Sequence, residues 1–279
     1  MAGDMFDGML EKAKRRLEDD PEFAVKFYSR AIKRAARKHG PEAPQVLNLR
    51  QDRALALHRN GESEKAEAEL AALIALRELA TGPDDFALQH AKRWHAGVLL
   101  DLGRFDEAER EWRRLSEEYD RLLGTDDPEA VAAHENHAAA MAKLNRTQEA
   151  ETEMAGVVAK RIAALGPDDV ATLQARASRA VFLDTLGRLE ESETAWRELA
   201  ESKARVLGVS HPDAILALSR YANVLYKQRR LPEADAKYGE VAALRAGTFG
   251  PDHPDTARAR DWQAVIQREL EGPDQAPMV

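Results

Sequence analysis

Residues 207–213 read LGVSHPD, and residues 249–255 read FGPDHPD. The two stretches lie 42 residues apart, and a glycine recurs at the same interval upstream of them. The full series of glycines is Gly40, Gly82, Gly124, Gly166, Gly208 and Gly250. A fixed period of this length indicates an array of structural repeats, in which each unit packs mainly on its neighbours.

Other residue types follow the same period. A second series of turn residues is Gly61, Gly103, Asn145, Gly187 and Arg229. Two series of small residues are Ala54, Ala96, Ala138, Ala180, Ala222 and Ala264, and Ala24, Ala66, Ala108, Ala150, Ser192 and Ala234. Bulky residues follow the second series by four positions, at Tyr28, Leu70, Trp112, Met154, Trp196 and Tyr238. Small and bulky residues at fixed helical spacing are typical of helices that interdigitate closely.

Each period predicts two helices. Gly208 suits the end of one helix, in a left-handed conformation that costs glycine little. Pro212 suits the first turn of the next, helix A, which we expect at about 212–228. A break near Arg229 leads to helix B, which we expect at about 232–247. One such pair cannot bury its apolar face alone, whereas stacked pairs can.

We therefore expect a single solenoid over residues 1–271. Its repeats are predicted at about 1–40, 41–82, 83–124, 125–166, 167–208 and 209–250, followed by a capping helix at 254–271 and a disordered tail at 272–279. Lys12 stands where other copies have alanine, so the opening helix, at about 4–18, is expected to pack in a shifted phase through Phe6, Leu10, Ala13 and Leu17. Gln267 and Arg268 give the last helix the polar outer face of a cap.

Composition narrows the class of protein. The chain has 279 residues, no cysteine, 32% charged residues and a net charge of -8. The absence of cysteine excludes disulfides and thiolate sites, and the negative charge argues against a dedicated nucleic-acid binder. No window of 18 apolar residues and no secretory signal are seen, so we expect a cytoplasmic protein without a membrane span. No motif for catalysis or for a cofactor stands out, and we expect neither.

The repeat resembles the tetratricopeptide repeat (TPR). Residues 103–108, GRFDEA, and residues 187–192, GRLEES, carry the resemblance most plainly. The 42-residue period, with LG-x-x-HPD between copies, is similar to the kinesin light chain subtype, which also occurs in bacterial regulators. The resemblance implies an all-α, right-handed superhelical solenoid of about six repeats with a C-terminal capping helix. It also implies a non-catalytic adaptor or scaffold that binds a peptide or helix of a partner protein.

In this family the A helices line a concave groove. The resemblance places groove positions three residues before each helix A alanine, one after it, and four or five after it. The predicted binding residues, to which Trp94 is added as an aromatic at an otherwise polar position, are Gln51, His58, Arg93, Trp94, Glu135, Lys143, Asp184, Ser219, Asn223, Tyr226 and Lys227. The alternative is a solvated face without a tight ligand.

The chain departs from the subtype in two ways. Relatives show Leu-Asn-Asn-Leu-Ala on helix A, whereas only Asn136 keeps an asparagine of that pair here. Only Asn223 and Lys227 resemble the Lys/Asn pairing with which some relatives clamp a peptide carboxylate. The nucleotide-binding domain of the bacterial regulators is not found in this chain, which has no GxxxxGK[ST] motif.

Three features leave alternatives open. A histidine group, consisting of His90, His95, His134 and His137, suggests either a metal site or hydrogen bonds between repeats; we commit to no metal ligand. Trp94 and Trp262 are either ligand anchors or packing residues. The basic helix at 21–39 either steers an acidic partner or is solvated.

The second hypothesis for function is self-association. A structural or regulatory scaffold would pair through the solenoid ends or the convex back, for example through Met5, Phe6, Met9 and Leu10. Homo-oligomers are therefore possible alongside a protein or peptide partner. A metal- or small-ligand-sensing role is a third hypothesis.

Overall fold

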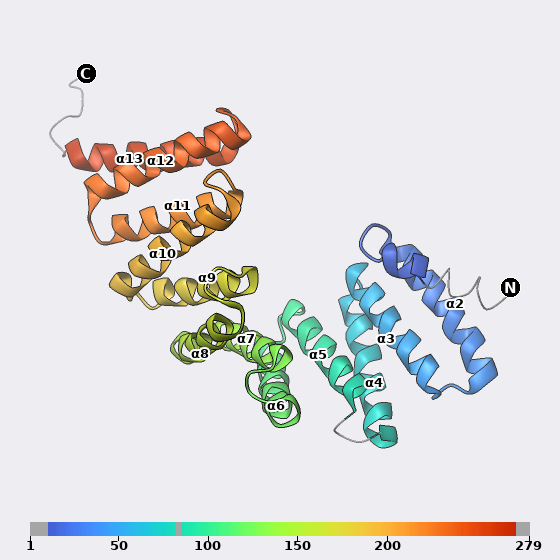
Figure 1. Ribbon diagram of the computed structural model, residues 1–279. Coiled ribbons are helices and arrows are strands. Elements are labelled where there is room, and N and C mark those ends of the chain that lie inside the picture. Colours follow the sequence, from blue (N-terminus) through green and yellow to red (C-terminus); the bar gives the residue numbers. More distant parts are fainter. Residues whose placement is uncertain (1–10, 82–84, 272–279) are drawn as a thin grey trace. The chain divides into compact units, whose positions relative to one another are not determined.

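The computed structural model describes residues 11–81 and 85–271. In these ranges the regular elements are helices, and no strand occurs. The chain divides into two compact units, Met1–Leu144 and Asn145–Val279 (Figure 1). The first unit contains α2 (Pro21–His39), α3 (Pro44–Arg59), α4 (Ser63–Thr81), α5 (Phe86–Asp101), α6 (Phe105–Leu123) and α7 (Pro128–Lys143). The second contains α8 (Thr147–Leu165), α9 (Val170–Thr185), α10 (Leu189–Leu207), α11 (Pro212–Lys227), α12 (Leu231–Phe249) and α13 (Pro254–Glu271).

One 42-residue period corresponds to two helices and the two turns that follow them. The odd-numbered helices are here called A helices and the even-numbered ones B helices. The A helices from α3 to α11 have 16 residues each, α13 has 18, and each B helix has 19. Three residues join an A helix to its B helix, and four residues join that B helix to the next A helix. The lengths predicted for the two helices, about 17 residues each, are therefore nearly right, although the B helix is the longer one.

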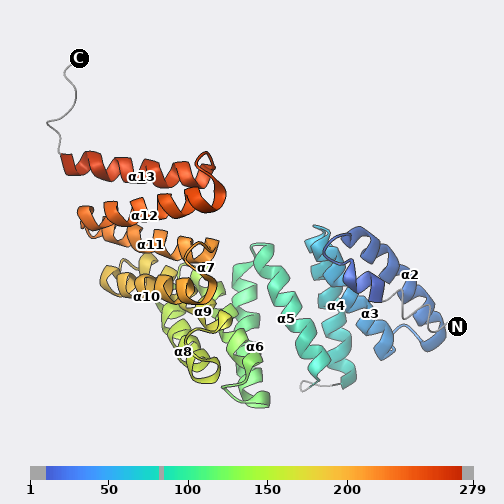
Figure 2. The same cartoon turned by 45° about the horizontal axis from the view of Figure 1, so that its top comes forward.

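Packing within each unit is mainly between consecutive helices. In the second unit α8 packs on α9, α9 on α10, and so on to α13. Figures 1 and 2 both show α10 to α13 stacked in chain order. One core cluster joins Ala180 of α9, Trp196 of α10 and Ala217 of α11, that is, an A helix, the following B helix and the next A helix. This is the nearest-neighbour arrangement of an all-α solenoid of helical repeats.

The periodic small and bulky residues form the core, as the sequence predicts. The small residues at positions 54, 96, 138, 180 and 222, and those at 66, 108, 150, 192 and 234, are fully buried. Trp112, Trp196 and Tyr238 are each less than 5% exposed. A large side chain beside two small ones lets three helices approach closely without a void. Ala264 of α13 is only half-buried.

The repeated turns use two backbone conformations. Gly187 and Arg229, each at the turn from an A to a B helix, have φ values of 70° and 62°, in the left-handed region. The B-to-A turn differs from our expectation: Gly208 has φ 95° and ψ 148°, which is not the left-handed helical conformation but a region open essentially to glycine alone. The backbone conformation at this turn therefore requires glycine more strictly than a left-handed helix cap would.

The HPD motif starts an A helix. His211 is the N-cap of α11, and its Nδ1 accepts a hydrogen bond from the backbone N–H of Asp213 at 3.1 Å. Pro212 occupies the first turn, where no N–H is needed. Asp127 and Asp169 serve as N-caps in earlier repeats, where a carboxylate oxygen accepts the same bond.

The first and last helices depart from the repeat pattern as the sequence predicts, in the residues that the structure describes. Ala13 is fully buried and Lys12 is exposed, which confirms the shifted phase of the opening helix, although the helix ends near residue 15 instead of 18. Gln267 and Arg268 are exposed on α13. Several predicted features lie outside the described residues, namely Met5, Phe6, Met9, Leu10, Gly82 and the tail at 272–279. The single-domain assignment over residues 1–271 stays a prediction.

Arg229 provides a test of the turn. Replacing Arg229, at φ 62°, by glycine removes the Cβ clash and is expected to raise the free energy of unfolding by about 0.5–1 kcal/mol, although it also removes an exposed ion pair with Glu269. The matched control is Gly187→Ala, at φ 70° with no atom within 4 Å of the added Cβ, which should lower it by about 1 kcal/mol. Urea denaturation followed by circular dichroism measures both; a destabilised Arg229→Gly would contradict the account.

Candidate functional site

Buried carboxylates link the repeats. Glu151 on α8 has a side chain only 6% exposed, and it accepts hydrogen bonds from two arginines of the next repeat. The Nε of Arg179, on α9, lies 2.9 Å from Oε1, and the Nη1 of Arg188, in the following turn, lies 2.8 Å from Oε2. Because both oxygens are bonded, the cost of burying the charge is offset by two charge-assisted hydrogen bonds.

The same position carries an acid in five repeats. These residues are Glu67, Glu109, Glu151, Glu193 and Asp235, each directly after a small residue of the second series. Glu67 lies 3.0 Å from Arg104, Glu109 lies 3.4 Å from His137, and Glu193 lies 2.7 Å from Arg230. The sequence analysis missed this series, although the 42-residue spacing of the acids was a sufficient signal.

The histidines take part in these links. His95 lies 2.8 Å from Glu111 and 3.3 Å from Glu67 of the preceding repeat, and His134 lies 3.1 Å from Asp120. In residues 11–81 and 85–271, no group of three or more His, Asp or Glu side chains is arranged to hold a metal ion. The hydrogen bonds between repeats that one interpretation expected are formed by His95, His134 and His137.

Two histidines have shifted pKa values in opposite directions. Burial disfavours the charged form of His95, but hydrogen bonds and attraction from Glu111 and Glu67 outweigh it and raise the pKa above its usual value. Burial lowers the pKa of His90, and the positive charge of Arg93 lowers it further. His95 therefore stays charged, and bonded, at higher pH than an ordinary histidine.

Many predicted groove residues bond to the neighbouring A helix. Three pairs share a spacing of 43 residues. The Nε2 of His58 on α3 lies 3.0 Å from the Oδ2 of Asp101 on α5. Lys227 on α11 donates to Asp184 on α9 at 2.5 Å, and Tyr226 donates to Glu269 on α13 at the same distance. Lys227 and Tyr226 thus hold adjacent repeats together, which reduces what the suggested Asn223/Lys227 clamp can offer a ligand.

The remaining predicted groove residues of the first unit also include some that bond to a neighbouring repeat. Gln51 bonds to His90, and Arg93 bonds to Glu129 of α7. Trp94 packs against the core around Leu70, so its role is packing on the preceding repeat. Of the two others, Glu135 is half-buried and Lys143 is exposed.

A recess between A helices lies in the second unit. It has a volume of about 260 Å³ and is bounded by α11 and α13, with α12 behind them. Ser219 and Asn223, both predicted groove residues, line it together with Leu216, Arg220, Tyr238, Arg245, Arg258, Ala259 and Trp262. We call it the arginine recess. It is the place in this unit where predicted groove residues border an open volume.

Aromatic rings form one wall of the arginine recess. The ring of Trp262 stacks on Tyr238 with centroids 6.2 Å apart and meets Tyr226 edge-on at 5.7 Å. Trp262 therefore packs on the preceding repeat, as one interpretation expected, yet 41% of it remains exposed. Burial raises the pKa of Tyr238, while the nearby Arg245 and Arg220 act in the opposite direction. Tyr238 thus contributes a neutral phenol flanked by two positive charges.

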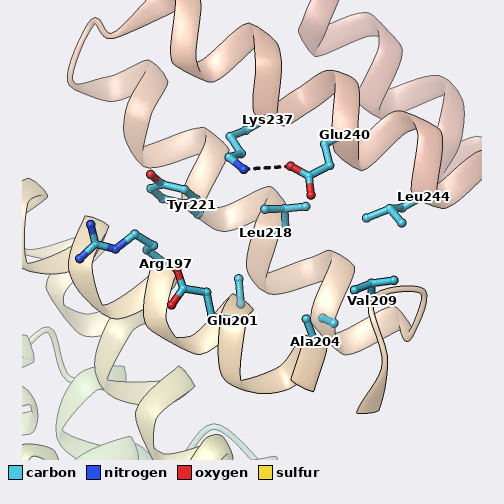
Figure 3. Close-up of a pocket in the computed structure, with 11 residues that line it drawn as sticks. Arg197, Glu201, Ala204, Val209, Leu218, Tyr221, Lys237, Glu240 and Leu244 are labelled. Atoms are coloured by element: carbon cyan, nitrogen blue, oxygen red, sulfur yellow. Dashed lines mark hydrogen bonds and ion pairs between the residues drawn. The ribbon is translucent and has the colours of Figure 1, made fainter. Parts of the chain in front are cut away.

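A second recess lies between B helices. It has a volume of about 160 Å³ and lies over α11 between α10 and α12, as Figure 3 shows. Leu218, Leu244 and Val209 give it an apolar floor and end. Lys237 and Glu240, which are hydrogen-bonded to each other at 2.9 Å, lie along one side.

The fold defines the class: the chain is an all-α solenoid of helical repeats. Residues 172–213 and 216–255 match the family model of the tetratricopeptide repeat. Residues 172–255 therefore carry two tetratricopeptide repeats, and the fold of the chain is similar to that of kinesin light chain-like repeat proteins. No curated protein matches the sequence.

Several solved structures share the fold. A putative kinesin light chain with nearly identical TPR-like repeats from Podosopora anserina is 19% identical with a TM-score of 0.67, over 74% of this chain and 98% of that one. BtubC from P. vanneervenii is 12% identical with a TM-score of 0.58, over 93% and 95%. YrrB, described as a TPR protein with an unusual peptide-binding site, is 16% identical with a TM-score of 0.52, over 84% and 97%. At these identities the likeness establishes the fold alone.

Among the helices that the structure describes, none combines the length and the apolar character needed to cross a membrane.

The raised pKa of His95 predicts how stability depends on pH. A group whose pKa is higher in the folded state stabilises fully below its unfolded pKa, about 6.5, and loses that contribution as the pH rises through the folded pKa. The stability difference between wild type and His95→Gln should therefore be largest near pH 6 and should shrink by pH 9. Urea denaturation across that range measures it. The same substitution at the exposed His39 is the control for the change of residue type. A difference for His95 that grows with pH would contradict the assignment.

Proposed function

We propose that the chain is a non-catalytic protein-interaction module that binds a peptide or a helix of a partner protein on its A-helix face. The binding centre in the second unit is the arginine recess. Side chains of this face that do not bond to a neighbouring repeat are available to a ligand, and at the recess they include Ser219 and Asn223. Specificity arises from which side chains the A helices present there.

The observation that carries this proposal is the recess itself. It combines an exposed aromatic ring, hydrogen-bonding side chains and an open volume of about 260 Å³ on a preformed scaffold. A rigid scaffold loses little conformational entropy on binding, so a modest number of contacts gives useful affinity. The similar fold of YrrB and of a Rap protein solved in complex with competence and sporulation factor supports a peptide or protein as ligand.

A displayed library of random 16-residue peptides tests the proposal. We expect selection on the wild type to yield binders whose affinity falls about tenfold to thirtyfold when Ser219 and Asn223 are both replaced by alanine, because each lost hydrogen bond contributes about 1 kcal/mol. The control is Arg197→Ala, which alters the recess between the B helices. Binders that are insensitive to the first change but lost with the second would place the site on the other face and contradict the proposal.

Self-association is the second candidate function. It is favoured by the recess between α10 and α12, beside which Val209 is 60% exposed. A second copy bound there would make the chain a dimer, and light scattering of the wild type and of Val209→Glu would detect it.

A further inference from the structure

Three arginines from three helices line the arginine recess. Arg220 comes from α11, Arg245 from α12 and Arg258 from α13. Arg220 and Arg245 are both close enough to the hydroxyl of Tyr238 to oppose the rise in its pKa. The side chains of the three arginines therefore border one volume, although their positions in the sequence show no such relation.

The charges around the arginine recess leave a net positive charge. Arg258 donates to the Oδ1 of Asp255 at 3.0 Å, and Arg245 donates to the backbone oxygen of Asp255 at 2.9 Å. Within the described part of the chain no hydrogen bond or ion pair is formed by Arg220. No acidic side chain lines the recess itself. Three positive charges against the single carboxylate of Asp255 leave a net charge of about +2, in a protein whose total charge is -8.

This net positive charge indicates the chemistry of the ligand. One guanidinium group satisfies both oxygens of a carboxylate, so a single Asp or Glu side chain would leave the other arginines uncompensated. A phosphorylated side chain carries a charge of about -1.5 to -2 and three acceptor oxygens, which matches the charge and the number of arginines. Ser219 and Asn223 supply further donors at the same wall.

The size of the recess and its aromatic wall extend the argument. A volume of about 260 Å³ equals roughly nine water volumes of about 30 Å³, so it holds more than a phosphate group alone. Trp262 lines the recess together with the arginines and is 41% exposed, so the residue that carries the phosphate can pack against it.

We propose that the arginine recess recognises a phosphoryl group on a side chain of the partner, through Arg220, Arg245 and Arg258. The inference rests on the proposed function, since it assumes that a peptide lies on the A-helix face. It makes binding of that partner conditional on phosphorylation.

Fluorescence anisotropy with labelled degenerate peptide pools tests the inference. Four pools of eleven residues have phosphotyrosine, phosphoserine, tyrosine or glutamate at the centre. At least one phosphorylated pool is expected to bind at least tenfold more tightly than the tyrosine and glutamate pools. Its affinity should fall at least tenfold in the double variant Arg220→Gln, Arg258→Gln, and severalfold in Arg220→Lys, which keeps the charge but loses bidentate bonding.

The matched control is Arg268→Gln, an exposed arginine of α13 outside the recess, which should leave the affinity unchanged. Inorganic phosphate alone serves as a competitor: if it displaces the phosphorylated pool only at far higher concentration than that pool's own dissociation constant, the peptide context contributes. Competition at equal concentration would overturn recognition of a phosphorylated peptide in favour of free phosphate.

Two further results would overturn the inference. If the tyrosine or glutamate pool binds as tightly and depends on Ser219 and Asn223, the phosphoryl group is not recognised, yet the proposed function stands. If a phosphorylated pool binds equally well to the Arg220→Gln, Arg258→Gln variant, the arginines are not the site. Circular dichroism confirms that each variant is folded.

Discussion

A buried or half-buried carboxylate near the start of the B helices α4, α6, α8 and α10 is the interaction on which the stacking of repeats depends. Glu151 is nearly inaccessible to water, and its two oxygens are bonded to Arg179 and Arg188 of the following repeat. A charge in this position is costly when unpaired, so the next repeat must be placed where its cations reach it. Apolar packing of small against large residues brings the helices together, and the carboxylate selects their relative position.

The two kinds of helix contribute different links between repeats. Carboxylates of the B helices bond to the following repeat, as Glu151 does to Arg179, and side chains of the A-helix face form a second set of links, such as Asp184 with Lys227. Ser219 and Asn223 take no part in these links, and they are the side chains that we propose for a ligand. Arg258 and Trp262 of α13 line the arginine recess together with residues of α11 and α12. The candidate site thus combines side chains from three consecutive helices.

Much of this could be predicted from the sequence, because the period is a local property. The glycines, the small residues and the bulky residues each report on one position of a repeat, and six copies make the pattern plain. The links between side chains could not be predicted in the same way. Whether Tyr226 reaches Glu269 or a ligand depends on the rotation between two helices, which no residue series encodes. The arginine recess depends on three helices at once and was found only in part, through Ser219 and Asn223.

A double-mutant cycle on Glu151 and Arg179 tests the central claim most directly. The free energy of unfolding is measured by urea denaturation for the wild type, Glu151→Gln, Arg179→Gln and the double variant. A buried link between repeats predicts a coupling energy of about 1–2 kcal/mol, compared with less than about 0.5 kcal/mol for the exposed Lys237–Glu240 pair within α12. A coupling energy for Glu151 and Arg179 as small as that of the exposed pair would show that apolar packing alone sets the stacking of the repeats.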